Sequence, residues 1–173
     1  MSVLEKFKSI RTFVFDVDGV MTDGNVQVTD KGEQWRTMNT KDGYSLQLAV
    51  KKGYRVLVIS GGQSEGVRLR LEGLGIKDVF LHVKDKMERL RAYMQEHDLG
   101  IEDMLYMGDD IPDYAVMKQV GLACAPADAA PEIRHIAAYI SSFNGGHGCV
   151  RDVIEKVLKL NGHWELDTSI ASK

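Results

Sequence analysis

The sequence predicts an α/β fold in which a parallel sheet is covered by helices on both faces. Short apolar runs of strand length alternate along the chain with longer stretches of helical periodicity, which is the pattern of parallel sheets. Several apolar runs are followed at once by acidic or hydroxyl side chains, as expected where parallel strands end at a binding edge. The 173 residues suit one domain, on a prior of about 150 residues per domain.

The first strand and a hairpin account for the N-terminal part of the pattern. The apolar run at residues 13–15 predicts a buried strand, and Gly19 allows the chain to turn after it. Residues 25–28 and 34–38 alternate in polarity on either side of a glycine-containing turn, which predicts a β-hairpin. The hairpin interrupts the alternation of strands and helices and has no obvious partner in the core. It is therefore a candidate for contact between subunits.

The middle of the chain alternates regularly between the two kinds of element. A helix is expected over residues 42–52, because Gly53 follows as a terminator. The helix at residues 84–99 has the clearest periodicity, with apolar side chains three or four residues apart. The elements expected between these two helices are a buried strand at 55–60, a helix at 64–74 and a short strand at 78–81.

The C-terminal part continues the same alternation. Pro112 suits the first turn of a short helix. The expected elements are a strand at 103–107, a helix at 112–119, a strand at 120–125, a helix at 131–138, a strand at 139–140 and an amphipathic helix at 149–160. We expect one domain over residues 1–162, with its hairpin at about 24–39, and a C-terminal tail over 163–173. The tail has no strong pattern, so the sequence allows either disorder or folding over a neighbouring site.

Composition and charge exclude several classes of partner. The net charge of −3 gives no electrostatic basis for binding nucleic acid or a membrane surface. No long apolar run predicts a membrane helix, and residues 1–10 lack the apolar core of a signal peptide. The two cysteines, Cys124 and Cys149, have no metal-type spacing and suit a reducing compartment. We therefore expect a cytoplasmic protein with neither nucleic-acid nor membrane partners.

Polar side chains gather where the predicted strands end. Because the carboxyl ends of parallel strands meet at one edge of a sheet, we expect these side chains to lie close together. The set comprises Asp16 and Asp18, Ser60, Lys84 and Lys86, and Asp109, Asp110 and Asp113.

The residue types in this set suit phosphoryl transfer. Clustered carboxylates favour a hard cation such as Mg²⁺, and closely spaced acids repel each other unless a cation lies between them or one of them holds a proton. The hydroxyl of Ser60 and the backbone N–H groups of the turn at Gly61 can bind phosphoryl oxygens. A lysine can neutralise phosphate charge, and a carboxylate can act as the nucleophile. Positioning and charge stabilisation are the main needs of phosphoryl transfer.

Four motifs give the chain a resemblance to a known superfamily. The segment Asp16-Val17-Asp18-Gly19-Val20, then Ser60, Lys86 and Gly108-Asp109-Asp110-Ile111-Pro112-Asp113 match, in order, the motifs of the haloacid dehalogenase superfamily. The resemblance implies a Rossmann-like core in which Asp16 is the nucleophile and Asp18 is the general acid and base. It also selects Lys86 over Lys84 as the functional lysine.

The same resemblance implies a ligand set for Mg²⁺. The ion would be held by Asp16, the backbone carbonyl of Asp18, and Asp109. Asp110 and Asp113 would support the metal and Lys86.

Members of this superfamily usually carry a cap domain, which this chain lacks. Neither residues 24–55 nor residues 61–86 provide the roughly 50 residues that a separate domain needs. The missing cap, the hairpin and the glycine-rich segment at 145–148 resemble the 3-deoxy-D-manno-octulosonate 8-phosphate (KDO8P) phosphatase group. That group implies homotetramers whose hairpins assemble at the centre and whose active sites are completed by neighbouring subunits. The implied substrate is a phosphorylated 2-keto-3-deoxy sugar acid, KDO8P first of all.

The resemblance extends to the substrate side of the site. The carboxylate of a sugar acid calls for basic side chains, and we expect Arg68 and Arg70 to supply them by reaching into a neighbour's site. Thr40 and Lys41 would line the pocket. A plain solvent-exposed role for the two arginines is the alternative.

Gly61, Gly146 and His147 complete the expected substrate contacts, because a glycine-rich turn before a helix favours anions. The chain departs from the group at Gly62, where a basic residue is common, and at Leu69, which interrupts a run of arginines. His147 also replaces a usual Lys or Glu. These departures leave a nine-carbon sugar-acid 9-phosphate open as a second substrate. Two functions of a different kind also stay open, namely a phospho-accepting module similar to a receiver domain and a non-catalytic regulator.

Overall fold

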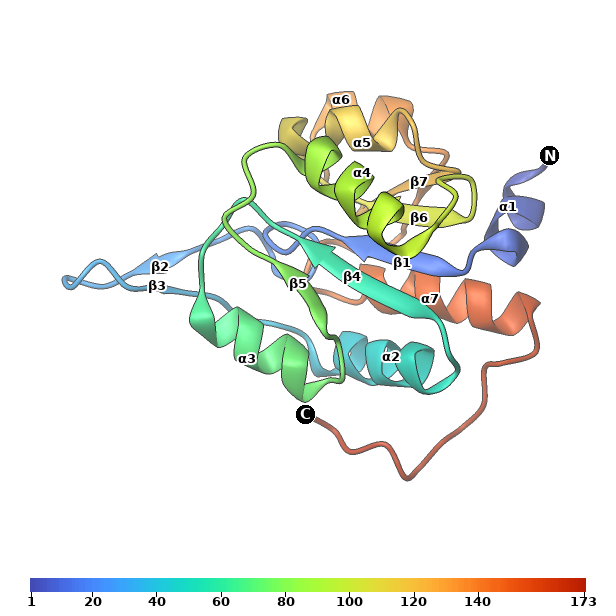
Figure 1. Ribbon diagram of the computed structural model, residues 1–173. Coiled ribbons are helices and arrows are strands. Elements are labelled where there is room, and N and C mark those ends of the chain that lie inside the picture. The colour runs from blue at the N-terminus through green and yellow to red at the C-terminus, as the bar shows by residue number, and fades with distance from the viewer.

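The computed structural model describes residues 1–173 and shows a central sheet between two layers of helices (Figure 1). The sheet has six parallel strands in the order β5-β4-β1-β6-β7-β8. The strands are β1 (Thr12–Phe15), β4 (Arg55–Ile59), β5 (Asp78–Phe80), β6 (Met104–Met107), β7 (Leu122–Ala125) and β8 (Tyr139–Ile140). The predicted α/β class is confirmed, and every predicted strand of the sheet is present.

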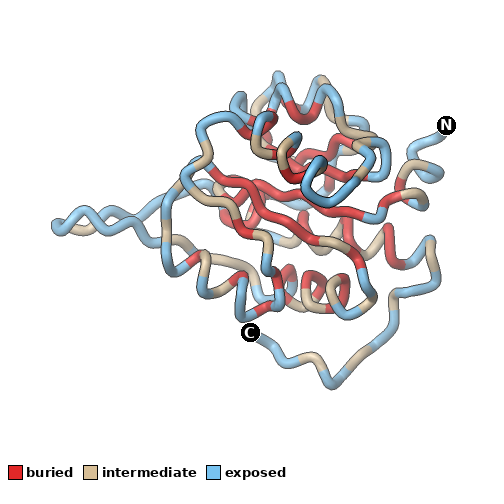
Figure 2. Tube along the Cα trace, viewed as in Figure 1, coloured by how far each residue is buried: buried red, intermediate tan, exposed pale blue.

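Alternation along the strands divides the apolar residues between two cores. Phe13 and Phe15 on β1 contribute to one core, and Val14 between them contributes to the other. Helices α1 (Val3–Ser9), α2 (Thr40–Lys51), α3 (Glu65–Gly73) and α7 (Cys149–Leu160) cover the first core. Helices α4 (Lys86–His97), α5 (Tyr114–Met117) and α6 (Pro131–Ile136) cover the second. The central strands β1, β6 and β7 are buried along their whole length, and the edge strands β5 and β8 are only partly buried (Figure 2).

Helix α1 was not predicted. The helix is capped at its N-terminus by two hydrogen bonds. The Ser2 hydroxyl accepts from the Glu5 backbone N–H, and the Glu5 carboxylate accepts from the Ser2 N–H. This reciprocal capping box stabilises a helix that buries only Phe7. Seven residues give too little periodicity to distinguish such a helix from an alternating loop.

Two helices near the edge of the sheet where the polar side chains gather begin differently from the prediction. Helix α4 begins at Lys86, two residues later than expected, because the Asp85 carboxylate accepts from the Glu88 N–H as an N-cap. The single helix expected at 112–119 is instead a 3₁₀ turn, η1 (Ile111–Asp113), followed by the short helix α5. The tighter turn brings the Asp113 carboxylate back onto the backbone N–H of Asp109.

The hairpin is shorter than predicted and projects from the body of the protein (Figure 1). Its antiparallel strands, β2 (Gln27–Val28) and β3 (Gln34–Trp35), pair over two residues each. The large side chains of Val28 and Trp35 are 69% and 58% exposed. A two-residue ladder with little buried surface is weak by itself, so its neighbours determine how well it is ordered.

The C-terminal residues lie against the chain's own helices. The Tyr44 hydroxyl accepts from the Asp167 N–H, and Lys51 forms an ion pair with the Asp167 carboxylate. At the end of the chain, the Arg70 guanidinium donates to the backbone oxygen of Lys173. The tail therefore runs along α2 and ends beside α3 (Figure 1).

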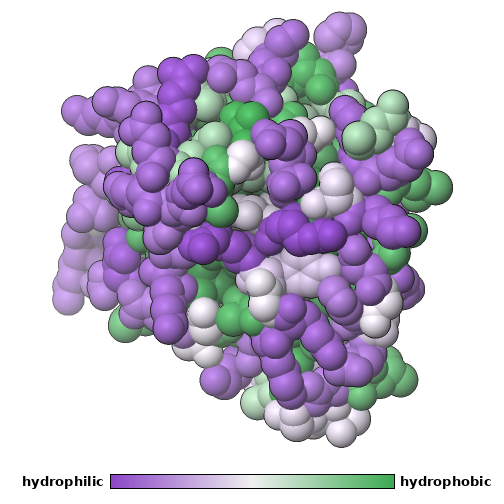
Figure 3. Space-filling model, turned by 45° about the vertical axis from the view of Figure 1, so that its right-hand side comes forward, coloured by the Kyte–Doolittle hydropathy of each residue, from purple (hydrophilic) through white to green (hydrophobic).

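The surface gives no sign of a large apolar face in the view of Figure 3, where hydrophobic atoms form small separate areas among hydrophilic ones. No helix has the length and apolar character needed to cross a membrane.

Candidate active site

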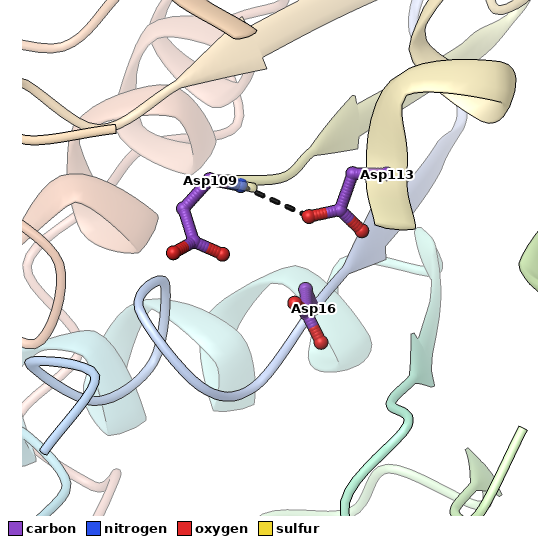
Figure 4. Close-up of side chains that lie close together, drawn as sticks. All are labelled: Asp16, Asp109 and Asp113. Carbon is purple, nitrogen blue, oxygen red and sulfur yellow. Dashed lines mark hydrogen bonds between the residues drawn. The ribbon is translucent and has the colours of Figure 1, made fainter. Parts of the chain in front are cut away.

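Three carboxylates converge at the edge of the sheet where its central strands end. Asp16 follows β1, while Asp109 and Asp113 come from the segment after β6. Each offers an oxygen, and these atoms all lie within 4.8 Å of one another (Figure 4). The parallel pairing of β1 with β6 produces this convergence, since it places Phe15 opposite Met107.

Lys86 is held between two of these carboxylates. Its Nζ lies 3.0 Å from Asp16 Oδ2 and 2.7 Å from Asp113 Oδ1. Only 5% of Lys86 is exposed, and Asp113 is fully buried. The Tyr106 hydroxyl also donates to Asp113 Oδ1, at 2.5 Å, and the Asp109 N–H donates to Asp113 Oδ2 at 3.0 Å. Asp113 is therefore occupied by four partners, with the Asp110 N–H as the last, and acts as a fixed support for Lys86.

Asp16 and Asp109 have carboxylate oxygens that the protein satisfies less completely. Asp16 Oδ1 accepts from the Val17 N–H at 2.7 Å. The Asp109 carboxylate lies directly against Gly19, where an added Cβ would come within 1.9 Å of Oδ2. Gly19 also has a φ of +84°, a left-handed conformation that favours glycine. Gly19 therefore allows both the turn after Asp18 and the close packing of the Asp109 carboxylate against the backbone.

The electrostatics of the cluster favour a bound cation. Burial raises the pKa of Asp16 to about 7, and the charge of Asp113 adds to this while Lys86 opposes it. Burial likewise raises the pKa of Asp109 to about 7, followed by the charges of Asp16 and Asp113. Burial acts to lower the pKa of Lys86, but the two carboxylates beside it outweigh this and the net shift is upward. A divalent cation would relieve the repulsion between Asp16 and Asp109, and their oxygens are the ligand type that Mg²⁺ prefers.

Asp18 is paired with an arginine that no sequence motif singled out. Arg36 Nε lies 2.6 Å from Asp18 Oδ1, and its Nη2 lies 3.2 Å from Oδ2. The Arg36 side chain is only 5% exposed although it comes from the end of the exposed hairpin. Nothing in its spacing from the motifs indicates this contact, because it depends on how the hairpin leaves the core.

A cavity of about 400 Å³ opens over the cluster. Ser60 and Gly61 reach it from the end of β4, and the Ser60 hydroxyl accepts from the Gly62 N–H at 3.1 Å. Asp110 also lines it, with its carboxylate capping the Ile111 N–H. The lining residues are Asp16, Asp18, Gly24, Ser60, Gly61, Gly62, Val83, Lys84, Lys86, Asp109, Asp110 and Pro112. All the predicted catalytic and metal residues except the buried Asp113 thus line one cavity.

Most of the predicted substrate residues lie elsewhere. Thr40, Lys41 and His147 line a second cavity of about 630 Å³ between the start of α2 and α7. Arg70 lines a third, of about 920 Å³, between the hairpin and α3. The Arg68 guanidinium donates to the Val79 carbonyl and lines neither. Within one chain, these side chains do not meet the carboxylate cluster.

The loop that contains Gly146 is fastened to the start of α2. Asn39 Nδ2 donates to the Gly146 carbonyl at 3.2 Å, and the Gly146 N–H donates to the Val20 carbonyl. The buried Asp42 of α2 caps the N-terminus of α7, because its Oδ1 accepts from the Arg151 N–H at 2.8 Å. Burial raises the pKa of Asp42 to about 6. The Lys41-Asp42-Gly43 segment therefore connects the two helices, a structural role that its sequence did not reveal.

Comparison with known proteins adds an independent line of information. A family model described as haloacid dehalogenase-like hydrolase matches residues 74–154. The 3-deoxy-D-manno-octulosonate 8-phosphate phosphatase KdsC of Escherichia coli K12 is 33% identical over 160 residues, covering 92% of this chain and 85% of that protein. The crystal structure of 3-deoxy-D-manno-octulosonate 8-phosphate phosphatase from Yersinia pestis is 32% identical and matches with a TM-score of 0.90, covering 93% and 87% of the two chains.

A third relative was solved with ligands. The KDO8P phosphatase of Moraxella catarrhalis, in complex with a magnesium ion, a phosphate ion and KDO, matches with a TM-score of 0.88 at 29% identity. The match covers 91% of this chain and 90% of that one.

Proposed function

The chain belongs to the 3-deoxy-D-manno-octulosonate 8-phosphate phosphatase family of haloacid dehalogenase-like hydrolases, and we propose that it hydrolyses KDO8P to KDO and phosphate. The observation that carries this proposal is the Asp16–Lys86–Asp109 cluster, in a chain that matches these phosphatases over almost its whole length. A phosphatase needs a nucleophile, a proton donor and positive charge at one point, and the cluster with Asp18 supplies them.

In the first step, an Asp16 carboxylate oxygen attacks phosphorus. The bond between phosphorus and the sugar oxygen breaks, and the protonated Asp18 carboxyl gives its proton to that leaving oxygen. The products of this step are free KDO and a chain that carries the phosphoryl group on Asp16. Lys86, 3.0 Å from Asp16 Oδ2, holds the nucleophile in place and favours its ionised form.

In the second step, Asp18 acts as the base. It takes a proton from water as the water oxygen attacks phosphorus, and the bond between phosphorus and Asp16 breaks. Phosphate leaves, and both aspartates return to their starting states. Ser60 and the backbone N–H groups at Gly61 hold the phosphoryl oxygens during both steps.

The enzyme uses Mg²⁺, for which Asp16, the backbone carbonyl of Asp18, and Asp109 are the proposed ligands. Asp110 and Asp113 support it, and the four partners of Asp113 suit that indirect role. When bound, the ion supplies positive charge to the phosphoryl oxygens.

The substrate pocket is completed by a neighbouring subunit in this proposal. The hairpin is exposed and carries Trp35, and Arg70 lines the cavity between the hairpin and α3. A homotetramer would bring Arg68 and Arg70 of one chain to the carboxylate end of a substrate bound by another, while Thr40, Lys41, Gly146 and His147 line the same pocket. Sedimentation equilibrium would measure the number of subunits, and a monomer with full activity would contradict the proposed shared pocket.

We also propose a cytoplasmic location. Cys124 and Cys149 are both unpaired and buried, as is usual where thiols stay reduced.

The test of the proposed reaction is phosphate release from a panel of sugar phosphates, with and without EDTA. We expect KDO8P to give the highest kcat/KM and chelation to remove activity. A preference for a nine-carbon 2-keto-3-deoxy sugar-acid 9-phosphate would transfer the proposal to that substrate. Equal activity on every substrate, or activity unchanged by EDTA, would contradict it.

A further inference from the structure

We propose that Arg36 is a positioning residue for Asp18 and that it fastens the general acid and base to the hairpin. The inference rests on the proposed phosphatase reaction, in which Asp18 gives a proton in one step and removes one in the next. Arg36 touches neither the phosphoryl group nor the nucleophile in this proposal, and acts only through the Asp18 carboxylate.

The contact between the two side chains is bidentate. Arg36 Nε lies 2.6 Å from Asp18 Oδ1 and Nη2 lies 3.2 Å from Oδ2. A planar guanidinium that meets both oxygens fixes the plane of the carboxylate as well as its position. Asp18 is 31% exposed at its side chain, so packing alone leaves it room to turn. The arginine therefore supplies an orientation that the core does not. The bidentate pair corresponds to the ionised Asp18 that acts as the base of the second step; in the first step, the protonated carboxyl would keep one oxygen on Arg36 and donate its proton from the other.

Two of the three remaining donors of Arg36 bond to the hairpin. Nη1 donates to the Gln34 carbonyl at 3.2 Å, and Nη2 donates to the Gln34 side-chain oxygen at 3.4 Å. An arginine has five N–H donors, and these contacts use four of them. Little capacity is left for a substrate, which favours a positioning role over direct binding. Because Gln34 lies on β3, any movement of the hairpin acts on Asp18 through this side chain.

Glycine at position 62 leaves room for the pair. A Cβ added there would lie 3.0 Å from Asp18 Oδ2 and 3.2 Å from Arg36 Nη2, which is tighter than ordinary contact. The turn after β4, which also presents Ser60, is therefore shaped around the ion pair. A side chain at this position would require the carboxylate of Asp18 and the guanidinium of Arg36 to shift by a few tenths of an ångström.

Two substrates separate the roles of Asp18 in the test. The sugar alkoxide of KDO8P needs a proton to leave, whereas p-nitrophenolate leaves without one. In both cases, the phosphoryl group on Asp16 needs a base for its hydrolysis. Loss of Asp18 orientation should therefore slow both steps with KDO8P but only the second step with p-nitrophenyl phosphate.

The central variant is Arg36→Met, which keeps the length of the apolar stem and removes the guanidinium. We expect kcat for KDO8P to fall about ten- to a hundredfold with KM unchanged, since hydrogen bonds to a charged group are lost. With p-nitrophenyl phosphate, rapid quenching should show a burst of p-nitrophenolate and a phosphorylated chain that accumulates. Arg36→Lys should recover part of kcat, because one cation on a flexible stem cannot hold both oxygens.

A double mutant distinguishes action through Asp18 from direct action on the substrate. In an Asp18→Asn background, Arg36→Met should not slow breakdown of the phosphorylated chain any further. Arg91→Met is the matched control, since Arg91 is exposed on α4 and its side chain donates to the Gln119 side-chain oxygen, away from the carboxylate cluster. It should leave both substrates unaffected.

Several results would overturn the inference. These are an Arg36→Met effect on KM alone, equal slowing of both steps with p-nitrophenyl phosphate, or a full additional loss in the double mutant. If Arg36→Met does not fold, unchanged kinetics in Arg36→Lys would have the same meaning. A wild-type chain that does not hydrolyse KDO8P but is phosphorylated by p-nitrophenyl phosphate would contradict the proposed substrate. The role of Arg36 could still be tested from the rate of dephosphorylation. A chain that neither substrate phosphorylates would overturn both.

Discussion

The carboxylate cluster and the predicted substrate residues differ in how the fold holds them. Asp16, Lys86 and Asp113 are buried and joined by hydrogen bonds and ion pairs. Asp16 follows β1, Asp113 lies on η1 after the adjacent strand β6, and Lys86 begins α4. Lys41 and His147, by contrast, are exposed and line a different cavity. Within one chain, the sheet brings the residues for phosphoryl transfer together, whereas the predicted substrate residues lie on surfaces away from the carboxylate cluster.

The difference has a physical origin. A buried lysine between two carboxylates must be fixed, because a loose arrangement would leave charges unpaired in the interior. A pocket that recognises a sugar acid has no such requirement, since water solvates its charged side chains until the substrate arrives. The two regions should therefore respond differently to substitution.

The largest effect is expected from Asp16→Asn, which tests the cluster side of the comparison. Loss of the nucleophilic carboxylate should lower kcat by about a thousandfold or more. The amide has nearly the same shape, so the fold should persist, which circular dichroism would verify. Phosphate release at the wild-type rate would end the assignment of Asp16 as nucleophile.

Lys86→Met should damage both stability and catalysis. The change leaves Asp16 and Asp113 buried without their shared cation, and breaking a buried pair costs about 3 kcal/mol or more. Urea unfolding at pH 8 and the kcat for KDO8P would measure the two consequences. Lys84→Met is the matched control for stability, because Lys84 is exposed and forms no ion pair. Equal stability of the two variants would show that the cluster is less tightly held than the comparison assumes.

The same contrast explains how far sequence reasoning reached. The convergence of Asp16, Ser60 and Asp109 could be predicted, because the carboxyl ends of parallel strands meet at one edge of the sheet. Arg36 could not, since its contact depends on the path of an exposed hairpin rather than on any periodic pattern.

The substrate residues show a second limit. Arg68 and Arg70 are two residues apart on one helix and looked equivalent in the sequence. In the structure, Arg68 binds the Val79 carbonyl while Arg70 lines the cavity beside the hairpin. Short elements set further limits, since α1 covers only Val3–Ser9 and the tight turn at η1 could not be told from a helix.

The third prediction concerns Mg²⁺ and pH within the cluster. The pKa values of Asp16 and Asp109 are raised to about 7 from the ordinary 3.8. Raised folded-state values mean that these two groups contribute most stability below about pH 4, and lose it as the pH rises towards 7. Bound Mg²⁺ should reverse this trend, because the ion binds the ionised carboxylates.

We therefore expect the increase in Tm caused by Mg²⁺ to grow between pH 6 and pH 8. The linkage amounts to about 2.7 kcal/mol at roughly a hundred times Kd. Thermal melting with Mg²⁺ and with EDTA would measure it, with Asp16→Asn as the variant in which the increase should shrink. The same increase at pH 6 and pH 8 would mean that the acids of the cluster do not titrate in this range.

The smallest effect is expected on the open side, from Arg70→Ala. Because the proposed contact is with the carboxylate of the substrate and not with the phosphoryl group, KM for KDO8P should rise about tenfold while kcat changes little. Hydrolysis of p-nitrophenyl phosphate, which has no such carboxylate, should be unaffected. Arg70 lines the cavity between the hairpin and α3, where a substrate carboxylate could meet its guanidinium.

Arg68→Ala provides the comparison within the same helix. Both guanidiniums donate to a backbone oxygen, Arg68 to Val79 in β5 and Arg70 to Lys173 in the tail. Only Arg70 lines the cavity beside the hairpin, so the effect of Arg68→Ala on KM should be the smaller of the two. A fall in kcat for both substrates in Arg70→Ala would place that arginine with the carboxylate cluster, and the division between a self-contained catalytic end and a shared recognition end would then be wrong. A larger rise in KM for Arg70→Ala than for Arg68→Ala, with kcat unchanged in both, would show that the two arginines of α3 differ in their contribution to substrate binding.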